Sequence, residues 1–193
     1  MILILTTDRL TLRPLELGDI GLGIELFTNP NVVKHVGKLM TVDEISSGML
    51  TWIKRGGTGG CIGIWCATIT ETGEKIGTGA LLPMPIEEDD TNWDDVVTDV
   101  MPKGDVEVGY ILKESAWNRG YATEICQCLL RFAFEQTQLT EIVATFDDDN
   151  LGSRHVLEKC GLVHRGRRFV YAEDSIDFAI TRDEWWHRNV SPS

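Results

Sequence analysis

Hydrophobic residues recur along the chain with two different periods, which predicts that strands and helices are mixed. Residues 8–14 alternate between leucine and polar side chains, the pattern of a half-buried strand. Residues 17–28 are expected to form a short helix that stops before an Asn-Pro pair. Thr41 and Glu44 then form a capping box at the start of another helix, and glycines at 56–57 are expected to end it.

The rest of the chain continues this mixture of strands and helices. Strand patterns occur at 61–70, 75–82, 106–112, 141–146, 162–171 and 175–181. Helical patterns occur at 120–136, 150–160 and 182–188. Hairpin turns join the early strands, and residues 106–146 form a strand–helix–strand unit. The pattern predicts one α/β domain over residues 1–193, with a sheet flanked by helices.

An acidic insertion separates two predicted strands at about residues 83–104. Prolines stand at its edges, at positions 83, 85 and 102. Its carboxylates are Glu87, Glu88, Asp89, Asp90, Asp94, Asp95 and Asp99. A charge run of this kind is typical of a solvated loop, but a loop this long can also form a lid or bind a substrate. Both interpretations stay open.

The formal net charge of the 193-residue chain is −12, which argues against a nucleic-acid partner because phosphates would be repelled. The same charge favours a cationic partner, although it can also reflect solubility alone. The sequence has no apolar run long enough to cross a membrane, and its N-terminal MILIL lacks the features of a signal peptide. It does not fix the oligomeric state, for which we expect a monomer or a homodimer.

Five cysteines, at positions 61, 66, 126, 128 and 160, form neither a disulfide framework nor a metal motif. We expect buried, reduced thiols and a cytoplasmic location. The four histidines are scattered without the spacing of metal ligands, so no metal is expected. Arg165, Arg167 and Arg168 form a small basic cluster that either meets a phosphate or lies on a solvated hairpin edge.

The segment from 106 to 123 has the pattern of an anion site. A strand runs into a loop, and Arg119, Gly120 and Ala122 open the next helix. The first turn of a helix has unpaired N–H groups and a partial positive charge, which suit a phosphate. Gly120 allows close approach to the backbone, and Thr123 adds a hydroxyl. By itself this pattern also fits simple helix-entry geometry.

Four motifs in order resemble the GCN5-related N-acetyltransferase (GNAT) superfamily. Trp117-Asn-Arg-Gly-Tyr-Ala122 is similar to its Q/R-x-x-G-x-G/A pyrophosphate motif, with Trp in place of Gln or Arg. Asn150-Leu-Gly-Ser153 continuing to Gly161, the opening Thr7-to-Pro14 segment and Arg182-Asp-Glu-Trp185 resemble the branch of ribosomal-protein N-terminal acetyltransferases, the RimJ/RimL type. The resemblance implies a mixed, mostly antiparallel, twisted sheet of about six to seven strands.

The resemblance also implies a role for each site residue. Coenzyme A would be bound by Ile111, Leu112, Asn118, Arg119, Gly120, Tyr121, Ala122, Thr123 and Asn150. The backbone at 111–112 would pair with the pantetheine arm and polarise the thioester carbonyl. Asn150 can equally be a helix cap. Ser153 would protonate the departing thiolate, or it is only a polar residue near the cap.

The resemblance implies an N-acetyltransferase that moves the acetyl group of acetyl-CoA to a primary amine by direct attack. The amine would belong to a protein N-terminus or a small cationic molecule, and it must lose its proton before it attacks. Glu107 matches a strand glutamate that serves as the base in some superfamily members; otherwise it is a surface or salt-bridged residue. The alternative function is a non-catalytic acyl-CoA-binding sensor or regulatory module.

Overall fold

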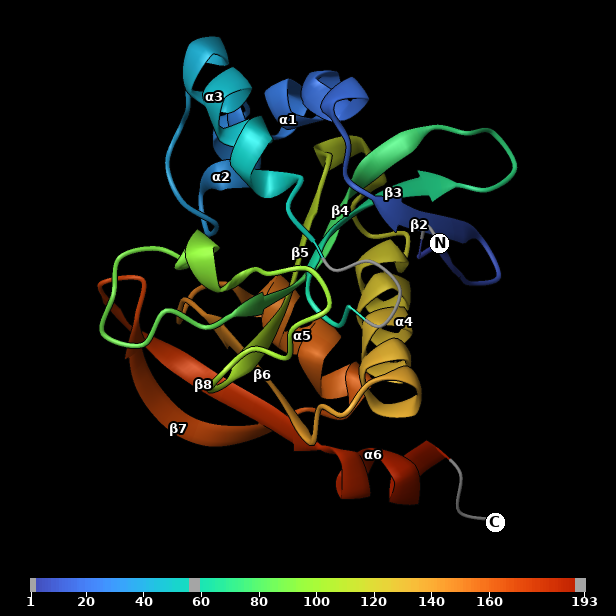
Figure 1. The fold of residues 1–193 in the computed structure, drawn as a ribbon, viewed down its shortest axis with the longest axis vertical. Helices are drawn as coiled ribbons and strands as arrows, with labels where there is room; N and C mark the ends of the chain where they lie inside the picture. Colours follow the sequence, from blue (N-terminus) through green and yellow to red (C-terminus); the bar gives the residue numbers. More distant parts are fainter. Residues whose placement is uncertain (1–2, 56–59, 190–193) are drawn as a thin grey trace.

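The computed structural model describes residues 3–55 and 60–189, and its central feature is a mixed sheet (Figure 1). The described part of the sheet has eight strands in the order β1-β2-β3-β4-β5-β6-β8-β7. Their bounds are β1 Leu5–Thr6, β2 Leu10–Pro14, β3 Gly63–Ile69, β4 Lys75–Pro83, β5 Val106–Leu112, β6 Glu141–Phe146, β7 Val163–Val170 and β8 Glu173–Thr181. Every neighbouring pair is antiparallel except β5 and β6, which are parallel.

The sheet has one strand more than the expected six to seven. The addition is β1, in which Leu5 is buried opposite Leu12 of β2. Two residues are too few for an alternating pattern to be recognised in the sequence. The prediction of an α/β fold with a mostly antiparallel sheet flanked by helices is otherwise confirmed.

Helices cover both faces of the sheet. Their bounds are α1 Ile20–Phe27, α2 Pro30–Val33, α3 Val42–Trp52, α4 Tyr121–Gln136, α5 Leu151–Cys160 and α6 Arg182–Asn189, with 3₁₀ turns η1 Leu17–Asp19, η2 Trp93–Asp95 and η3 Glu114–Ala116. Ile125 and Leu129 of α4 pack on one face in the main core, together with Val106, Val108 and Leu112 of β5. On the other face, α1–α3 form a second cluster that includes Ile111.

The predicted helix over 17–28 is divided at Asp19. The Asp19 carboxylate is fully buried and accepts hydrogen bonds from Arg13 at 2.6 and 2.8 Å, and Lys75 Nζ lies 2.7 Å from it. η1 ends there and α1 begins at the next residue. Burial alone would raise the pKa of Asp19, but the hydrogen bonds from Arg13 and Lys75 hold it at about 2.

The helix ends before the Asn29-Pro30 pair, as predicted, since α1 stops at Phe27; the same pair then begins α2. The Asn29 side chain accepts a hydrogen bond from the Asn31 amide at 2.9 Å, and proline occupies the first helical position. Thr41 and Glu44 form the predicted capping box of α3. The glycines expected to end α3 at 56–57 lie outside the described residues.

All five cysteines are buried and unpaired, in agreement with the expectation of buried thiols. Burial raises the pKa of the Cys61 and Cys66 thiols, the latter to about 11. Among the described residues, every helix is too short or too polar to cross a lipid bilayer.

Candidate functional site

The sheet opens between its two parallel strands. β5 pairs with β4 along its whole length, from Val106 to Leu112. On its other side, Glu107 and Val143 are the one pair of partners described between β5 and β6. Both strands continue beyond that pair, so the backbone of β5 towards Leu112 faces a gap. An exposed strand edge of this kind can pair with an extended amide-containing chain.

A tight turn carries the chain from β5 into α4. Asn118 and Gly120 both have left-handed backbones, with φ of 59° and 80°. Gly120 is the N-cap of α4 and has no side chain to cap the helix, and the amides of Tyr121, Ala122 and Thr123 have no side-chain partner among the described residues. These amides are therefore available to bind an anion.

The tryptophan that departs from the superfamily motif closes this turn. Trp117 Nε1 donates a hydrogen bond to the Leu112 carbonyl at 3.0 Å. Its indole thereby joins the end of β5 to the loop before α4. The Leu112 side chain is buried in the main core, so only its backbone can face the gap.

Arg9, which directly precedes β2 and was not predicted as a site residue, supports the turn. Its guanidinium bonds Glu124 of α4 at 2.7 Å and the Arg119 carbonyl at 3.0 Å. It also lies over the Tyr121 ring, 4.6 Å from the centroid. An ideal Cβ at Gly120 would lie 3.4 Å from Arg9 Nη2. At position 120, the positive φ therefore disfavours any residue other than glycine, and Arg9 leaves little room for a side chain.

The far side of the gap is formed by the start of α5. The Asn150 side chain accepts a hydrogen bond from the Ser153 amide at 3.1 Å, so it is an N-cap. Ser153 is half-buried, and its carbonyl accepts a hydrogen bond from the Tyr110 hydroxyl at 3.3 Å. Tyr110, interpreted from the sequence as a packing residue, thus bridges β5 and α5. Burial raises the pKa of Tyr110 well above its usual value.

Glu107 lies at the end of the gap where β5 and β6 are paired. It shares a face of β5 with Gly109 and Ile111, as strand parity predicts. Its carboxylate accepts a hydrogen bond from the Tyr171 hydroxyl, at the turn between β7 and β8. Burial, together with the nearby charge of Asp90, raises the pKa of Glu107 to about 8. A carboxylate with such a pKa is suited to exchange protons near neutral pH.

Comparison with known proteins identifies the family. The model of the family described as "Acetyltransferase (GNAT) domain" matches residues 9–163 of this chain. A relative from Aspergillus fumigatus, FsC-acetyl coenzyme A-N(2)-transacetylase, is 30% identical over 192 residues, which cover 94% of this chain and 77% of the relative. The chain belongs to the GNAT acetyltransferase family.

Solved structures share the fold at lower identity. A GNAT-family acetyltransferase from Bacillus anthracis is 20% identical, with a TM-score of 0.72, covering 94% of this chain and 99% of that one. Aminoglycoside acetyltransferase AAC(6')-Ib in complex with coenzyme A and kanamycin is 18% identical, with a TM-score of 0.72 and the same coverage. The family match and the transacetylase relative show that this GNAT protein is an acetyl-CoA-dependent N-acetyltransferase.

The residues of this GNAT protein fit coenzyme A. The uncapped amides at 121–123 offer donors to phosphate oxygens, and the absent side chain at Gly120 leaves the turn open. The free edge of β5 offers backbone groups to the amide-rich pantetheine arm. Each of the predicted cofactor residues at 111–112 and 118–123 lies on this edge or in this turn, and Asn150 lies at the start of α5 across the gap.

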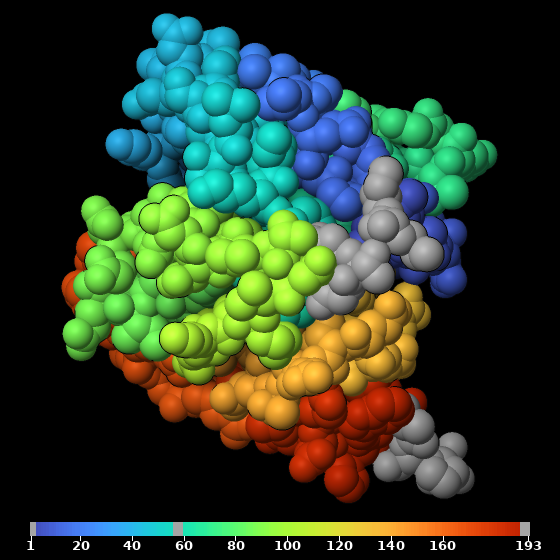
Figure 2. Space-filling view, in the orientation of Figure 1, coloured from blue at the N-terminus to red at the C-terminus, as the bar shows by residue number. Residues whose placement is uncertain are grey.

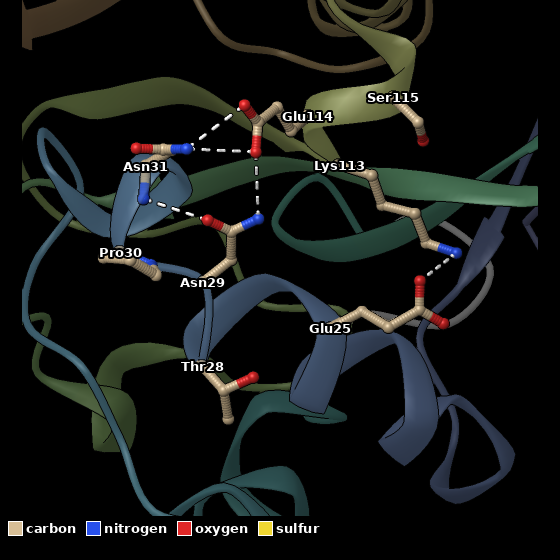
Figure 3. Close-up of a pocket in the computed structure, with 8 residues that line it drawn as sticks. All are labelled: Glu25, Thr28, Asn29, Pro30, Asn31, Lys113, Glu114 and Ser115. Carbon is tan, nitrogen blue, oxygen red and sulfur yellow. Dashed lines mark hydrogen bonds and ion pairs between the residues drawn. The ribbon is translucent and has the colours of Figure 1, made fainter.

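An open cleft of about 640 Å³ lies beside the turn, between α1–α2 and η3 (Figure 3). Asn29 and Asn31 both donate to the Glu114 carboxylate, at 3.3 and 3.1 Å. Lys113 Nζ forms an ion pair with Glu25 at 2.5 Å. The cleft is lined by Glu25, Thr28, Asn29, Pro30, Asn31, Lys113, Glu114 and Ser115. Its position at the end of β5 places it next to the turn that leads into α4.

The spacing of the histidines suggests that all four are isolated, but His35 lies beside two carboxylates. His35 Nδ1 lies 3.1 Å from Asp147 and 3.4 Å from Asp149, and Lys34 also pairs with Asp149 at 3.0 Å. Only the fold brings these groups together, since His35 and Asp147 are 112 residues apart. With the contacts to Glu114, these pairs hold α2 and the turn after it against the segments that follow both β5 and β6.

The basic cluster on β7 is neutralised by carboxylates. Arg165 pairs with Glu184 at 2.7 Å. Arg167 pairs with Asp148 and Asp174 at 2.7 and 2.6 Å. Arg168 bonds Asp105 and, at 3.1 Å, Asp177. These pairs favour the interpretation of the cluster as a hairpin edge rather than a phosphate site.

The acidic insertion is anchored to the sheet over part of its length. Ile86 forms an isolated bridge with Val170, and the Glu87 amide donates to the Phe169 carbonyl at 3.2 Å. Thr91 and Val96 are buried. The insertion crosses the front of the molecule between α3 and the β7–β8 hairpin (Figure 2). Glu87, Glu88, Asp89 and Asp90 are exposed, so the segment is neither wholly solvated nor wholly packed.

Proposed function

We propose that this N-acetyltransferase transfers acetyl from acetyl-CoA to a primary amine of a cationic acceptor, which attacks the thioester directly. The observation that carries the proposal is the arrangement along one strand. β5 leads from Glu107, a half-buried carboxylate, past an unpaired backbone edge to the uncapped first turn of α4. One strand thereby connects a base, a place for the thioester and a phosphate site.

The turn and the strand edge would hold the acyl donor. The amides of Tyr121–Thr123 would bind the diphosphate, and Arg9 would keep the turn in its left-handed conformation. The β5 backbone would pair with the pantetheine arm. A backbone N–H of β5 aimed at the thioester oxygen would stabilise the negative charge that develops there.

Glu107 and Ser153 would move the two protons. Glu107 would accept the proton of the ammonium, and its pKa of about 8 lies close to that of an α-amine, which is about 8. The Ser153 hydroxyl has no partner among the described residues, lies at the start of α5 and would protonate the thiolate. Glu107 is half-buried, bonded to Tyr171 and, among the described residues, without a cationic partner, which supports the base over a salt-bridged surface residue.

The acceptor is proposed to be cationic because the acidic insertion brings negative charge close to Glu107. Asp90 lies near enough to Glu107 to raise its pKa. Two similar proteins point to small amines, since one is named for transfer to an N(2) position and the other was solved with kanamycin. The motifs at 117–122 and 150–161 favour the RimJ/RimL-type branch, so a basic protein N-terminus remains a second acceptor class.

We further propose that residues 1–193 form a single N-acetyltransferase domain that works in the cytoplasm. One sheet runs through the described residues, and the acetyltransferase match covers most of the chain. The five unpaired thiols favour a reducing compartment. The net charge of −12 favours an amine over a nucleic acid as the partner.

The test is an acceptor panel with acetyl-CoA. Spermidine, kanamycin and a peptide with a basic N-terminus would each be incubated with the enzyme while thiol release and acetylated product are measured. We expect equal amounts of free thiol and acetylated amine with at least one cationic acceptor, and little of either with Glu107→Gln. Thiol release without any acetylated amine would contradict the proposal, because it would show hydrolysis instead of transfer.

A further inference from the structure

The turn between β7 and β8 has an unfavourable backbone for its sequence. Its two central residues, Tyr171 and Ala172, have φ of 53° and 57°. Two-residue hairpin turns with positive φ at both positions favour Asn-Gly or Asp-Gly, because other side chains crowd the backbone there. Neither position of this turn is occupied by glycine. Such strain is retained where the surrounding structure determines it, and it is often found at functional sites.

The acidic insertion holds the strained turn in place. The Ala172 amide donates to the Glu88 carbonyl at 2.9 Å, and the Glu87 amide donates to the Phe169 carbonyl at 3.2 Å. The bridge between Ile86 and Val170 lies next to these bonds. Through these contacts, residues 86–88 of the insertion hold the end of β7 and the turn in place.

The fixed turn directs one side chain at the proposed base. Tyr171 packs against a small buried cluster formed by Met84, Val143, Val170 and Ala179. Val143, a member of this cluster, is the β6 partner of Glu107, so Tyr171 lies near the paired end of the two parallel strands. From there the Tyr171 hydroxyl donates a hydrogen bond to the Glu107 carboxylate.

We propose that Tyr171 is a positioning residue that favours the ionised form of the Glu107 carboxylate and orients it towards the acceptor amine. The inference rests on the proposed function. In the reaction, one ammonium proton passes to Glu107, and the amine nitrogen forms the bond to the acetyl carbon. As the C–S bond breaks, the thiolate accepts the Ser153 proton, and the serine regains a proton from the nitrogen, which thereby loses its second one. A hydrogen bond donated to the ionised carboxylate favours that form. The strained turn supplies this donor from outside β5.

The other groups around Glu107 do not favour its ionised form. Asp90 of the acidic insertion adds negative charge, which disfavours a second one. Asp105, which lies just before β5 and two residues before Glu107, is bonded to Arg168 of β7. The strand partners on either side, Leu82 and Val143, are apolar. Among the described residues, Tyr171 is therefore the side chain seen to donate to the Glu107 carboxylate.

The experiment compares Tyr171→Phe with the parent enzyme. Phenylalanine keeps the ring and its packing and removes only the hydroxyl. The pKa of Glu107 would be measured by NMR titration of carboxyl-labelled glutamate, with the Glu107 signal assigned by Glu107→Gln. We expect this pKa to rise by about one unit or more in Tyr171→Phe. Ala172→Gly relaxes the turn but keeps the hydroxyl, and it should leave the pKa unchanged.

A kinetic measurement gives a second readout that a merely structural role would not change. With spermidine or kanamycin as acceptor, the acid limb of kcat/KM should move to higher pH in Tyr171→Phe. Below that limb the loss should be about tenfold, and the KM for acetyl-CoA should stay the same.

An unchanged Glu107 pKa in Tyr171→Phe would overturn the proposal, and so would an equal loss of acetyl-CoA affinity and turnover. The NMR titration needs no acceptor, so its outcome stands even if the acceptor panel gives no product. The two proposals can therefore fail separately.

Discussion

Replacing Gly120 tests whether the start of α4 binds the phosphates of the acyl donor. Gly120→Glu places a Cβ on a backbone with φ of 80° and brings it to 3.4 Å from Arg9 Nη2. A side chain in the left-handed region costs about 1–2 kcal/mol of folding free energy. The new carboxylate would also face the bound diphosphate. Two like charges 4 Å apart repel by about 4 kcal/mol near a protein surface.

Solvent screening lowers this repulsion at an exposed turn, so the expected loss of acetyl-CoA affinity is about 10- to 100-fold or more. Isothermal calorimetry on folded protein would measure the affinity. Gly73→Glu is the matched control, because Gly73 has a similar φ of 72° but open space around it. It should lose similar stability and keep the parent's affinity. Parent affinity in folded Gly120→Glu would refute the assignment of the phosphate site.

Three further predictions test other parts of the account. Ser153→Ala should lower turnover, measured by stopped flow, by about 10²- to 10⁴-fold, with little change in the acetyl-CoA affinity measured by calorimetry. Equal losses of turnover and affinity would make Ser153 a structural residue. Replacing Glu87, Glu88 and Asp89 by Ser should raise the KM of a polycationic acceptor at low salt and flatten its salt dependence, whereas the same loss of charge at Glu71, Glu74 and Glu135 should not. The folded-state pKa of Asp19, about 2, lies below its ordinary value of 3.8, so ionised Asp19 contributes about 2 kcal/mol to the free energy of unfolding above pH 4, and this stability is lost between about pH 4 and 2. In Asp19→Asn, the free energy of unfolding should not fall in this pH range. An identical pH dependence in parent and variant would show that the ion pairs of Asp19 are not a source of stability.

The sequence predicted the parts of the site that depend on local rules. The N-caps at Thr41 and Asn150 follow from residue type and position in a helix. The strand–turn–helix unit from β5 to α4 lies in one continuous segment, so its pattern was readable. The parity of β5 also placed Glu107 on the correct face.

The remaining site contacts join residues far apart in the chain. Tyr171 bonds Glu107 across 64 residues, and Arg9 bonds Glu124 across 115. No local pattern reports such a pairing. The one sequence signal available was that Arg9 and Glu124 both belong to segments resembling the same superfamily. The left-handed turn at Tyr171 had no glycine to indicate it, because contacts with the acidic insertion impose that conformation.

Amide hydrogen exchange with and without acetyl-CoA tests the central claim most directly, since it locates the donor on the chain without an acceptor. The account predicts slower exchange at the first-turn amides of α4, Tyr121–Thr123, and along the open edge of β5 near Ile111 and Leu112. The amides of α6, at Arg182–Asn189, should serve as an unchanged internal reference. Slower exchange confined to other segments, with α4 and β5 unaffected, would contradict the claim that acetyl-CoA binds in the gap between β5 and β6.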